Sequence, residues 1–156
     1  MNDQYAPMIP SFTLFKGFTL DGAHMLLDCG DVRELLPGAM LIKEGDEPTF
    51  VLLVLIGKLE VFVERHGRRL VLSEAGPGTI LGELAVLCGI ARSASVRATE
   101  KSAVLQWPAA SFRSLLLHNV FLSERIFRES LRTLIEKERS LIQSLVRSYD
   151  NGKPNE

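Results

Sequence analysis

The spacing of apolar residues divides the chain into three zones. Residues 19–30 predict one short helix. From about residue 37 to residue 107, short apolar runs alternate with glycine-containing turns, which predicts many short strands. After Pro108 the apolar period becomes helical, and no glycine or proline interrupts residues 120–149. This order predicts a short helix, then a β-sandwich or barrel, and finally two helices, the second of them long.

One strand of the central zone has two distinct faces. Between residues 59 and 64 an apolar set of side chains alternates with a mixed set, which are Leu59, Val61 and Val63 on one side and Glu60, Phe62 and Glu64 on the other. In a strand, a period of two places each set on its own face of the sheet. We therefore expect one buried face and one face of mixed character.

Composition limits the kind of partner. The 156 residues, 46% of them apolar and 24% charged, fit one globular domain. The net charge of −1 offers no basic excess for a nucleic-acid backbone. The longest apolar run, at residues 50–56, is far shorter than the roughly 20 residues that span a bilayer. The first residues do not resemble a signal peptide, and Cys29 and Cys88 are far apart, so we expect a cytoplasmic protein with reduced thiols and no membrane contact.

Signatures of catalysis and of metal binding are missing from the sequence. The three histidines, His24, His66 and His118, form no pair at the spacing of metal ligands. No Gly-x-Ser-x-Gly motif occurs. We therefore expect a binding protein and not an enzyme, with no catalytic residue, no metal and no cofactor.

The most informative segment is GELAVLCGIARSASVRA, at residues 82–98. Glu83 follows a glycine at the start of an expected short helix, and Arg92 comes nine residues later beside small side chains. Arginine can bind two phosphate oxygens at once, and an ionised carboxylate accepts from a hydroxyl. The pair suits a ligand with a phosphate at one end and a hydroxyl at the other. The residues alone leave a second interpretation open, in which Glu83 and Arg92 form an internal ion pair.

The segment resembles the phosphate-binding cassette of the cyclic nucleotide-binding domain family. This family includes the catabolite activator proteins and the regulatory subunits of cyclic-AMP-dependent protein kinase. The resemblance covers about residues 12–140 and extends to the segments PGAMLIKEGDEP and IGKLEVFV. A match of this length makes the cassette a more specific signal than an isolated glycine motif.

The resemblance implies a role for each residue of the cassette. Glu83 would accept from the ribose 2′-hydroxyl, and Arg92 would bind the cyclic phosphate. The remaining site residues would be Gly82, Leu84 and Ala85 on the short helix and Ser93 and Ala94 over the phosphate. A serine in place of a threonine after the arginine favours cyclic AMP over cyclic GMP as the ligand.

The fold implied by the resemblance is mainly β, a β-jelly-roll barrel with an N-terminal helix and a long C-terminal helix. We expect a flexible N-terminus at residues 1–11, the binding domain at residues 12–149 and a disordered tail at residues 150–156. Glycines would shape turns of the barrel at Gly38, Gly45 and Gly57. The long helix would cover the base, with contacts from among Arg132, Glu136, Arg139 and Ser140.

The long helix also carries an apolar line that favours a homodimer. Its members are Phe127, Leu131, Leu134, Leu141 and Leu145, flanked by Ile135, Ile142 and Tyr149. Glu138 is the one charged residue at a seam position. A helix of about 30 residues reaches about 45 Å, which is more than a barrel of this size covers. We therefore expect the distal half of the line to be exposed in a monomer.

The expected function is a regulatory sensor of a cyclic mononucleotide that signals to an unknown downstream protein. We expect no DNA binding, because no helix-turn-helix follows the long helix as it does in catabolite activators. The alternative is the same fold without nucleotide binding. It would then act as a protein-interaction domain or sense another small ligand, such as a cyclic dinucleotide.

Overall fold

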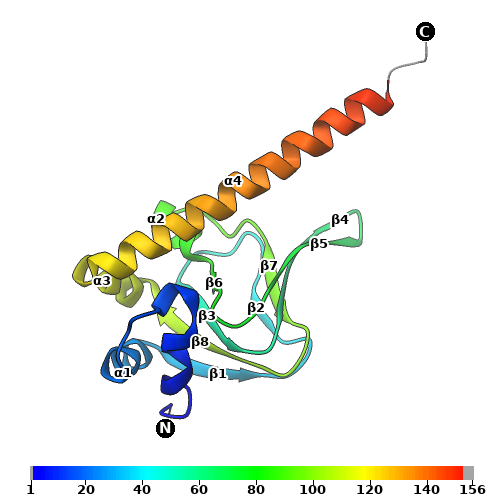
Figure 1. Ribbon diagram of the computed structural model, residues 1–156. Coiled ribbons are helices and arrows are strands. Elements are labelled where there is room, and N and C mark those ends of the chain that lie inside the picture. Colours follow the sequence, from blue (N-terminus) through cyan, green and yellow to red (C-terminus); the bar gives the residue numbers. More distant parts are fainter. Residues whose placement is uncertain (1, 153–156) are drawn as a thin grey trace.

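The computed structural model describes residues 2–152. Two antiparallel sheets form a barrel, with short helices at one end and one long helix crossing it (Figure 1). In chain order the elements are η1 (Ala6–Ser11), η2 (Thr13–Phe15), α1 (Leu20–Asp28), β1 (Asp31–Leu35), β2 (Met40–Ile42), β3 (Phe50–Ile56), β4 (Leu59–Arg65), β5 (Arg68–Ala75), β6 (Ile80–Leu81), α2 (Glu83–Cys88), β7 (Ser95–Ala98), β8 (Ser102–Pro108), α3 (Ala109–His118) and α4 (Val120–Asn151).

The strand order confirms the expected fold class. One sheet has the order β1-β8-β3-β6 and the other the order β2-β7-β4-β5. All of these neighbours pair in antiparallel fashion, and most of them are distant in sequence. This is a mainly β, jelly-roll-like arrangement with short helices before it and a long helix after it.

Strand β3 is buried on both faces, which explains its uninterrupted apolar run. Leu52 and Val54 belong to the core inside the barrel. Val51 and Leu53, which point the other way, pack in a second core between the first sheet and the helices. Trp107 of β8 lies in this second core and donates its indole N–H to the carbonyl of Leu26, at 2.8 Å. The first sheet is therefore the layer that joins the barrel to the helices.

The mixed face of β4 is more buried than its composition suggests. Phe62 is only 3% exposed, because the guanidinium groups of Arg69 and Arg97 lie 4.5 Å and 5.7 Å from its ring centroid. Glu60 is also buried, and it forms an ion pair with Arg97 at 3.3 Å. Cation–π contacts and an ion pair thus take the place of solvent on this face.

The chain termini differ from the expected boundaries. Within residues 1–11, expected to be flexible, Ala6–Ser11 form η1, and Ala6 and Ile9 have no exposed surface. At the other end, α4 runs to Asn151, so the first residues of the expected tail are helical. Residues 153–156 lie outside the described part of the chain.

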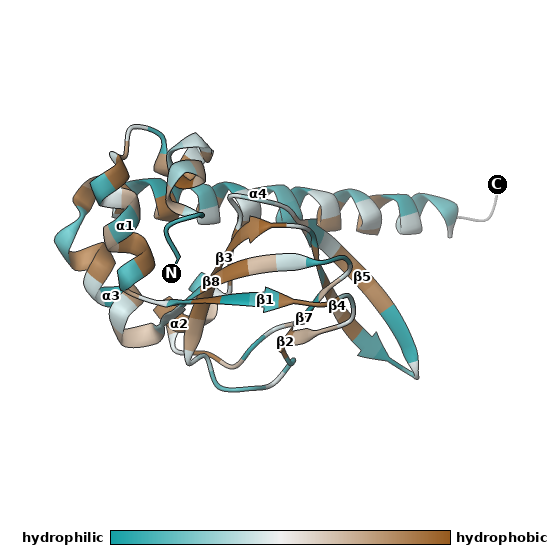
Figure 2. Ribbon diagram, turned by 90° about the horizontal axis from the view of Figure 1, so that it is seen from below, coloured by the Kyte–Doolittle hydropathy of each residue, from teal (hydrophilic) through white to brown (hydrophobic). Residues whose placement is uncertain are grey.

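The expected helices and turn glycines are confirmed. Helix α1 begins after Thr19, whose side-chain oxygen accepts from the backbone N–H of Gly22 at 3.1 Å. Positive φ angles mark the turn glycines Gly38, Gly45 and Gly57. Helix α4 spans 32 residues, close to the predicted bounds. Its first turns lie against the body of the molecule, and its distal half extends beyond the barrel (Figures 1 and 2). Within residues 2–152, no helix is both long and apolar enough to cross a membrane.

Candidate ligand-binding site

The cassette folds as the predicted short helix followed by a loop. Helix α2 begins after Gly82, which has a φ of 80°, and ends before Gly89, which has a φ of 65°. Both angles lie in the left-handed region that favours glycine. A Cβ at Gly82 would also collide with the Arg92 guanidinium. Gly82 is therefore fixed by its backbone conformation and by the close approach of Arg92.

The Arg92 side chain is anchored in the protein. It is 4% exposed, and its Nη1 donates to the carbonyl oxygen of Gly82 at 2.8 Å. Its Nη2 donates to the carbonyl oxygen of Phe50. Backbone hydrogen bonds also tie Arg92 to the turn at residues 45–46, at 2.8 and 2.9 Å. Burial lowers the pKa of the guanidinium, and the carboxylates of Asp46 and Glu83 partly offset this effect.

Glu83 occupies the first turn of α2, and its carboxylate faces α4. Ser130 Oγ of α4 donates to Glu83 Oε1 at 2.8 Å. Burial raises the pKa of the Glu83 carboxyl group. The hydrogen bond from Ser130, a backbone N–H and the positive charges of Lys137 and Arg92 oppose this rise. The carboxylate is thus desolvated, but it is held by groups that favour its ionised form.

Glu83 and Arg92 come together without pairing. Glu83 follows Gly82 in the chain and the Arg92 guanidinium packs against Gly82, yet in the described part of the chain their charged groups form no direct ion pair. Arg92 instead uses backbone carbonyls, and Glu83 uses a hydroxyl. The internal ion pair that the sequence left open is therefore not what holds this loop.

The other expected site residues lie on the same two segments. Leu84 and Ala85 are on α2, with Ala85 buried and Leu84 partly buried. In the loop, Ser93 is exposed and Ala94 is partly buried. The next residue, Ser95, is buried and accepts from the backbone N–H of Glu44 at 2.9 Å. The loop is thus held at Arg92 and Ser95, and the two expected ligand contacts, Ser93 and Ala94, lie between these residues.

The structure adds two residues that sequence reasoning missed, Ser130 and Phe50. Ser130 follows Leu122 and Ile126 at a spacing of four, and these are the three buried residues of α4. That spacing was available in the sequence, although a serine in such a row is easily read as a surface residue. Phe50 lies under the Arg92 guanidinium, 42 residues away in sequence, and no local pattern indicates this contact.

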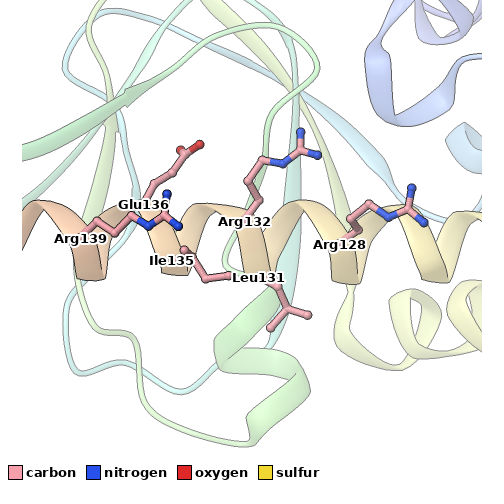
Figure 3. Close-up of a pocket in the computed structure, with 6 residues that line it drawn as sticks. All are labelled: Arg128, Leu131, Arg132, Ile135, Glu136 and Arg139. Carbon is pink, nitrogen blue, oxygen red and sulfur yellow. The ribbon is translucent and has the colours of Figure 1, made fainter.

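The proposed base contacts on α4 are all exposed, namely Arg132, Glu136, Arg139 and Ser140. The first three line a pocket along α4 together with Arg128, Leu131 and Ile135 (Figure 3). Arg132 also forms an ion pair with Glu129 at 3.8 Å. Ser130 of α4 forms a hydrogen bond with the cassette.

Comparison with known proteins identifies the family of this chain. Residues 32–119, more than half of the chain, match the cyclic nucleotide-binding domain, and the chain belongs to this family. The type II regulatory subunit of cAMP-dependent protein kinase from Drosophila melanogaster is 26% identical over 154 residues, covering 93% of this chain and 40% of that protein. Lysophospholipase NTE1 from Cryptococcus neoformans is 34% identical over 85 residues, covering 54% of this chain and 5% of that protein.

A solved structure extends the likeness beyond the cassette. The catabolite activator protein of Thermus thermophilus superposes with a TM-score of 0.74 and 25% identity, over 83% of this chain and 62% of that one. The chain spans less than half the length of the two curated relatives. The domain is therefore related to cAMP-binding regulatory proteins, and it also resembles a segment of a much longer lysophospholipase.

Proposed function

We propose that the protein is a regulatory sensor that binds a cyclic mononucleotide through Arg92 and Glu83. The observation that carries this proposal is the placement of one cation and one carboxylate next to Gly82 without a direct ion pair. Two of the five N–H donors of the guanidinium serve backbone carbonyls, which leaves donors for a phosphate. A carboxylate held by one hydroxyl can still accept from a second, such as that of a ribose.

Cyclic AMP is the ligand we favour over cyclic GMP. Ser93 is exposed next to Arg92, where its small side chain leaves room beside a bound phosphate. The regulatory subunit that the chain resembles belongs to a cAMP-dependent protein kinase. Leu84 and Ala85 of α2, with Ser93 and Ala94 of the loop, would complete the wall around the sugar and phosphate.

The output of such a sensor would pass through α4. Its apolar line is exposed along its whole length, including the near-half residues Phe127 at 44% and Leu131 at 58%. A different row, that of Leu122, Ile126 and Ser130, is buried against the body of the molecule. We propose that two copies of the chain associate through this exposed line and that a downstream protein binds the resulting dimer.

Neither catalysis nor DNA recognition is part of this proposal. The residues of the site are suited to hydrogen bonding and charge pairing, and the net charge of −1 gives no general attraction to DNA. Both cysteines are free, which suits the cytoplasm, where we place the protein.

Isothermal titration with cyclic AMP, cyclic GMP and a cyclic dinucleotide tests the proposal. We expect saturable binding of a cyclic mononucleotide by the full chain. Binding of the dinucleotide alone, or of none of the three, would instead support the alternative of a different ligand or a protein-interaction domain.

A further inference from the structure

Ser130 is the point at which α4 and the cassette share a buried polar contact. Its side chain lies in the row that seats α4 on the body of the molecule, and the residue is 6% exposed. A buried hydroxyl without a partner costs free energy, so such groups are almost always hydrogen-bonded. Here the partner is Glu83 Oε1, at 2.8 Å and 47 residues away in sequence.

The contact orients the Glu83 carboxylate without using up its capacity to accept. An ionised carboxylate has roughly four acceptor positions on two oxygens. Ser130 takes a position on Oε1 and thereby limits rotation of the group. A ligand hydroxyl then binds to a carboxylate that is already oriented and desolvated. This reduces the free-energy cost of ordering the carboxylate when the ligand binds.

We propose that Ser130 is a positioning residue that presents the Glu83 carboxylate to the ribose hydroxyl of the ligand. This inference rests on the proposed nucleotide binding. Because Glu83 belongs to α2 and Ser130 to α4, the acceptor is complete only when α4 is seated. Ligand binding and the seating of α4 are therefore thermodynamically coupled, each favouring the other.

Competition between the Ser130 hydroxyl and the ribose hydroxyl for Glu83 would have the opposite effect on ligand binding. If the Ser130 hydroxyl occupied the place that the ribose hydroxyl needs, ligand binding would have to displace it. Removing the hydroxyl would then tighten binding. The two possibilities differ in the sign of a single measurement, and the remaining acceptor capacity of the carboxylate favours the positioning role.

The experiment compares cyclic AMP with 2′-deoxy cyclic AMP, which lacks the hydroxyl in question. Full-length wild type, Ser130→Ala, Ser130→Thr and Ser144→Ala are titrated with both. Ser144 is a matched control, because it is an exposed serine of α4 that donates to the carbonyl of Ser140 at 3.0 Å. Thermal unfolding of each variant checks that the fold is retained.

We expect Ser130→Ala to weaken cyclic AMP binding roughly 3- to 10-fold, the effect of one lost hydrogen bond. Binding of 2′-deoxy cyclic AMP should change much less, because that ligand does not use the carboxylate. Ser130→Thr retains a hydroxyl and should retain most of the affinity, and Ser144→Ala should match wild type. Equal losses for the two ligands, or tighter binding of cyclic AMP, would overturn the positioning role.

A measurement without ligand separates this inference from the proposed function. The carboxyl carbon of Glu83 can be followed by NMR through a pH titration of wild type and Ser130→Ala. Loss of the donor should raise the pKa of Glu83, while Lys137 of α4 and Arg92 of the loop remain to favour its charged form. An unchanged pKa would refute the contact itself. A raised pKa in a protein that binds no cyclic nucleotide would refute the proposed function, and with it the role of Ser130 toward ribose.

Discussion

The guanidinium of Arg92 lies over the ring of Phe50, with its central carbon 4.9 Å from the ring centroid. The same group donates to the backbone carbonyls of Phe50 and Gly82, which belong to different elements. The proposed phosphate ligand is therefore also a brace between β3 and the start of α2. Replacing it should affect stability and binding together, and the two effects have to be measured separately.

Arg92→Ala should weaken cyclic AMP binding roughly 10- to 150-fold, the effect of losing a hydrogen-bonded charge at the phosphate. It should also lower the free energy of unfolding by about 1–3 kcal/mol, because two backbone carbonyls lose their donor. Arg92→Lys should recover only part of the binding, since an ammonium group cannot hold two oxygens in a fork. Titration calorimetry and chemical denaturation measure the two quantities.

Arg113 supplies the control for that experiment. It lies on α3 and donates to the carbonyl of Val86 in α2 at 2.7 Å, so it braces the same helix without belonging to the proposed site. Arg113→Ala should destabilise the fold and leave cyclic AMP affinity within about twofold of wild type. Equal loss of affinity in the Arg113 and Arg92 variants would mean that Arg92 acts only as a brace.

Glu83 should make the stability of the ligand-free protein depend on pH. Burial raises the pKa of its carboxyl group in the folded state above its ordinary value. A group whose pKa is raised in the folded state contributes most to stability at pH values below its pKa in the unfolded state. That contribution to stability is lost as the pH rises through its pKa in the folded state. Glu83→Gln should therefore be more stable than wild type at neutral pH, with the difference shrinking in acid.

Thermal unfolding across that pH range measures the difference in stability. The same substitution that raises stability should weaken nucleotide binding. Glu83→Gln should bind cyclic AMP more weakly, because a neutral amide is a poorer acceptor for the ribose hydroxyl. A stability difference that is constant with pH would contradict the assignment of the raised pKa to Glu83. Glu100→Gln, at an exposed position between β7 and β8, serves as a control for loss of one acidic group.

Ser93 should influence the choice of base. In competition, cyclic AMP should displace a labelled nucleotide at lower concentration than cyclic GMP. Ser93→Thr should shift the preference toward cyclic GMP, because the added methyl group restricts the hydroxyl to fewer rotamers. Ser93→Ala, which lacks the hydroxyl, should not produce this shift. Preference of the wild type for cyclic GMP by about tenfold would contradict the proposal for cyclic AMP and leave the fold unaffected.

The sequence predicted those features that depend on local pattern. The short helix α2 and the long α4 both follow from neighbouring residues. The burial of η1 was not predicted, because prolines and a non-periodic pattern at residues 6–11 resemble a loop. The Ser130 contact with Glu83 was also missed, because it spans 47 residues and depends on how α4 is seated. Local propensity carries no information on such distant pairs.

The apolar line of α4 leads to the last prediction, which concerns the oligomeric state. Leu141, Leu145 and Ile142 are 66%, 70% and 52% exposed. The buried row of α4 ends at Ser130, so the body of the same chain does not cover this surface. An apolar face on a helix that extends beyond its domain is a suitable seam for a two-fold dimer. Multi-angle light scattering at micromolar concentration should show a dimer of the full chain and a monomer of a chain ending at Ser140.

Point variants make the test specific to the line itself. Leu145→Glu places a charge in the seam and should shift the population to monomer, whereas Gln143→Glu adds the same charge at an exposed position off the line and should not. Glu138 lies within the line, and a charge there opposes association, so Glu138→Leu should tighten the dimer. If wild type runs as a monomer with and without cyclic AMP, and Glu138→Leu does too, α4 has another partner and the homodimer proposal is wrong.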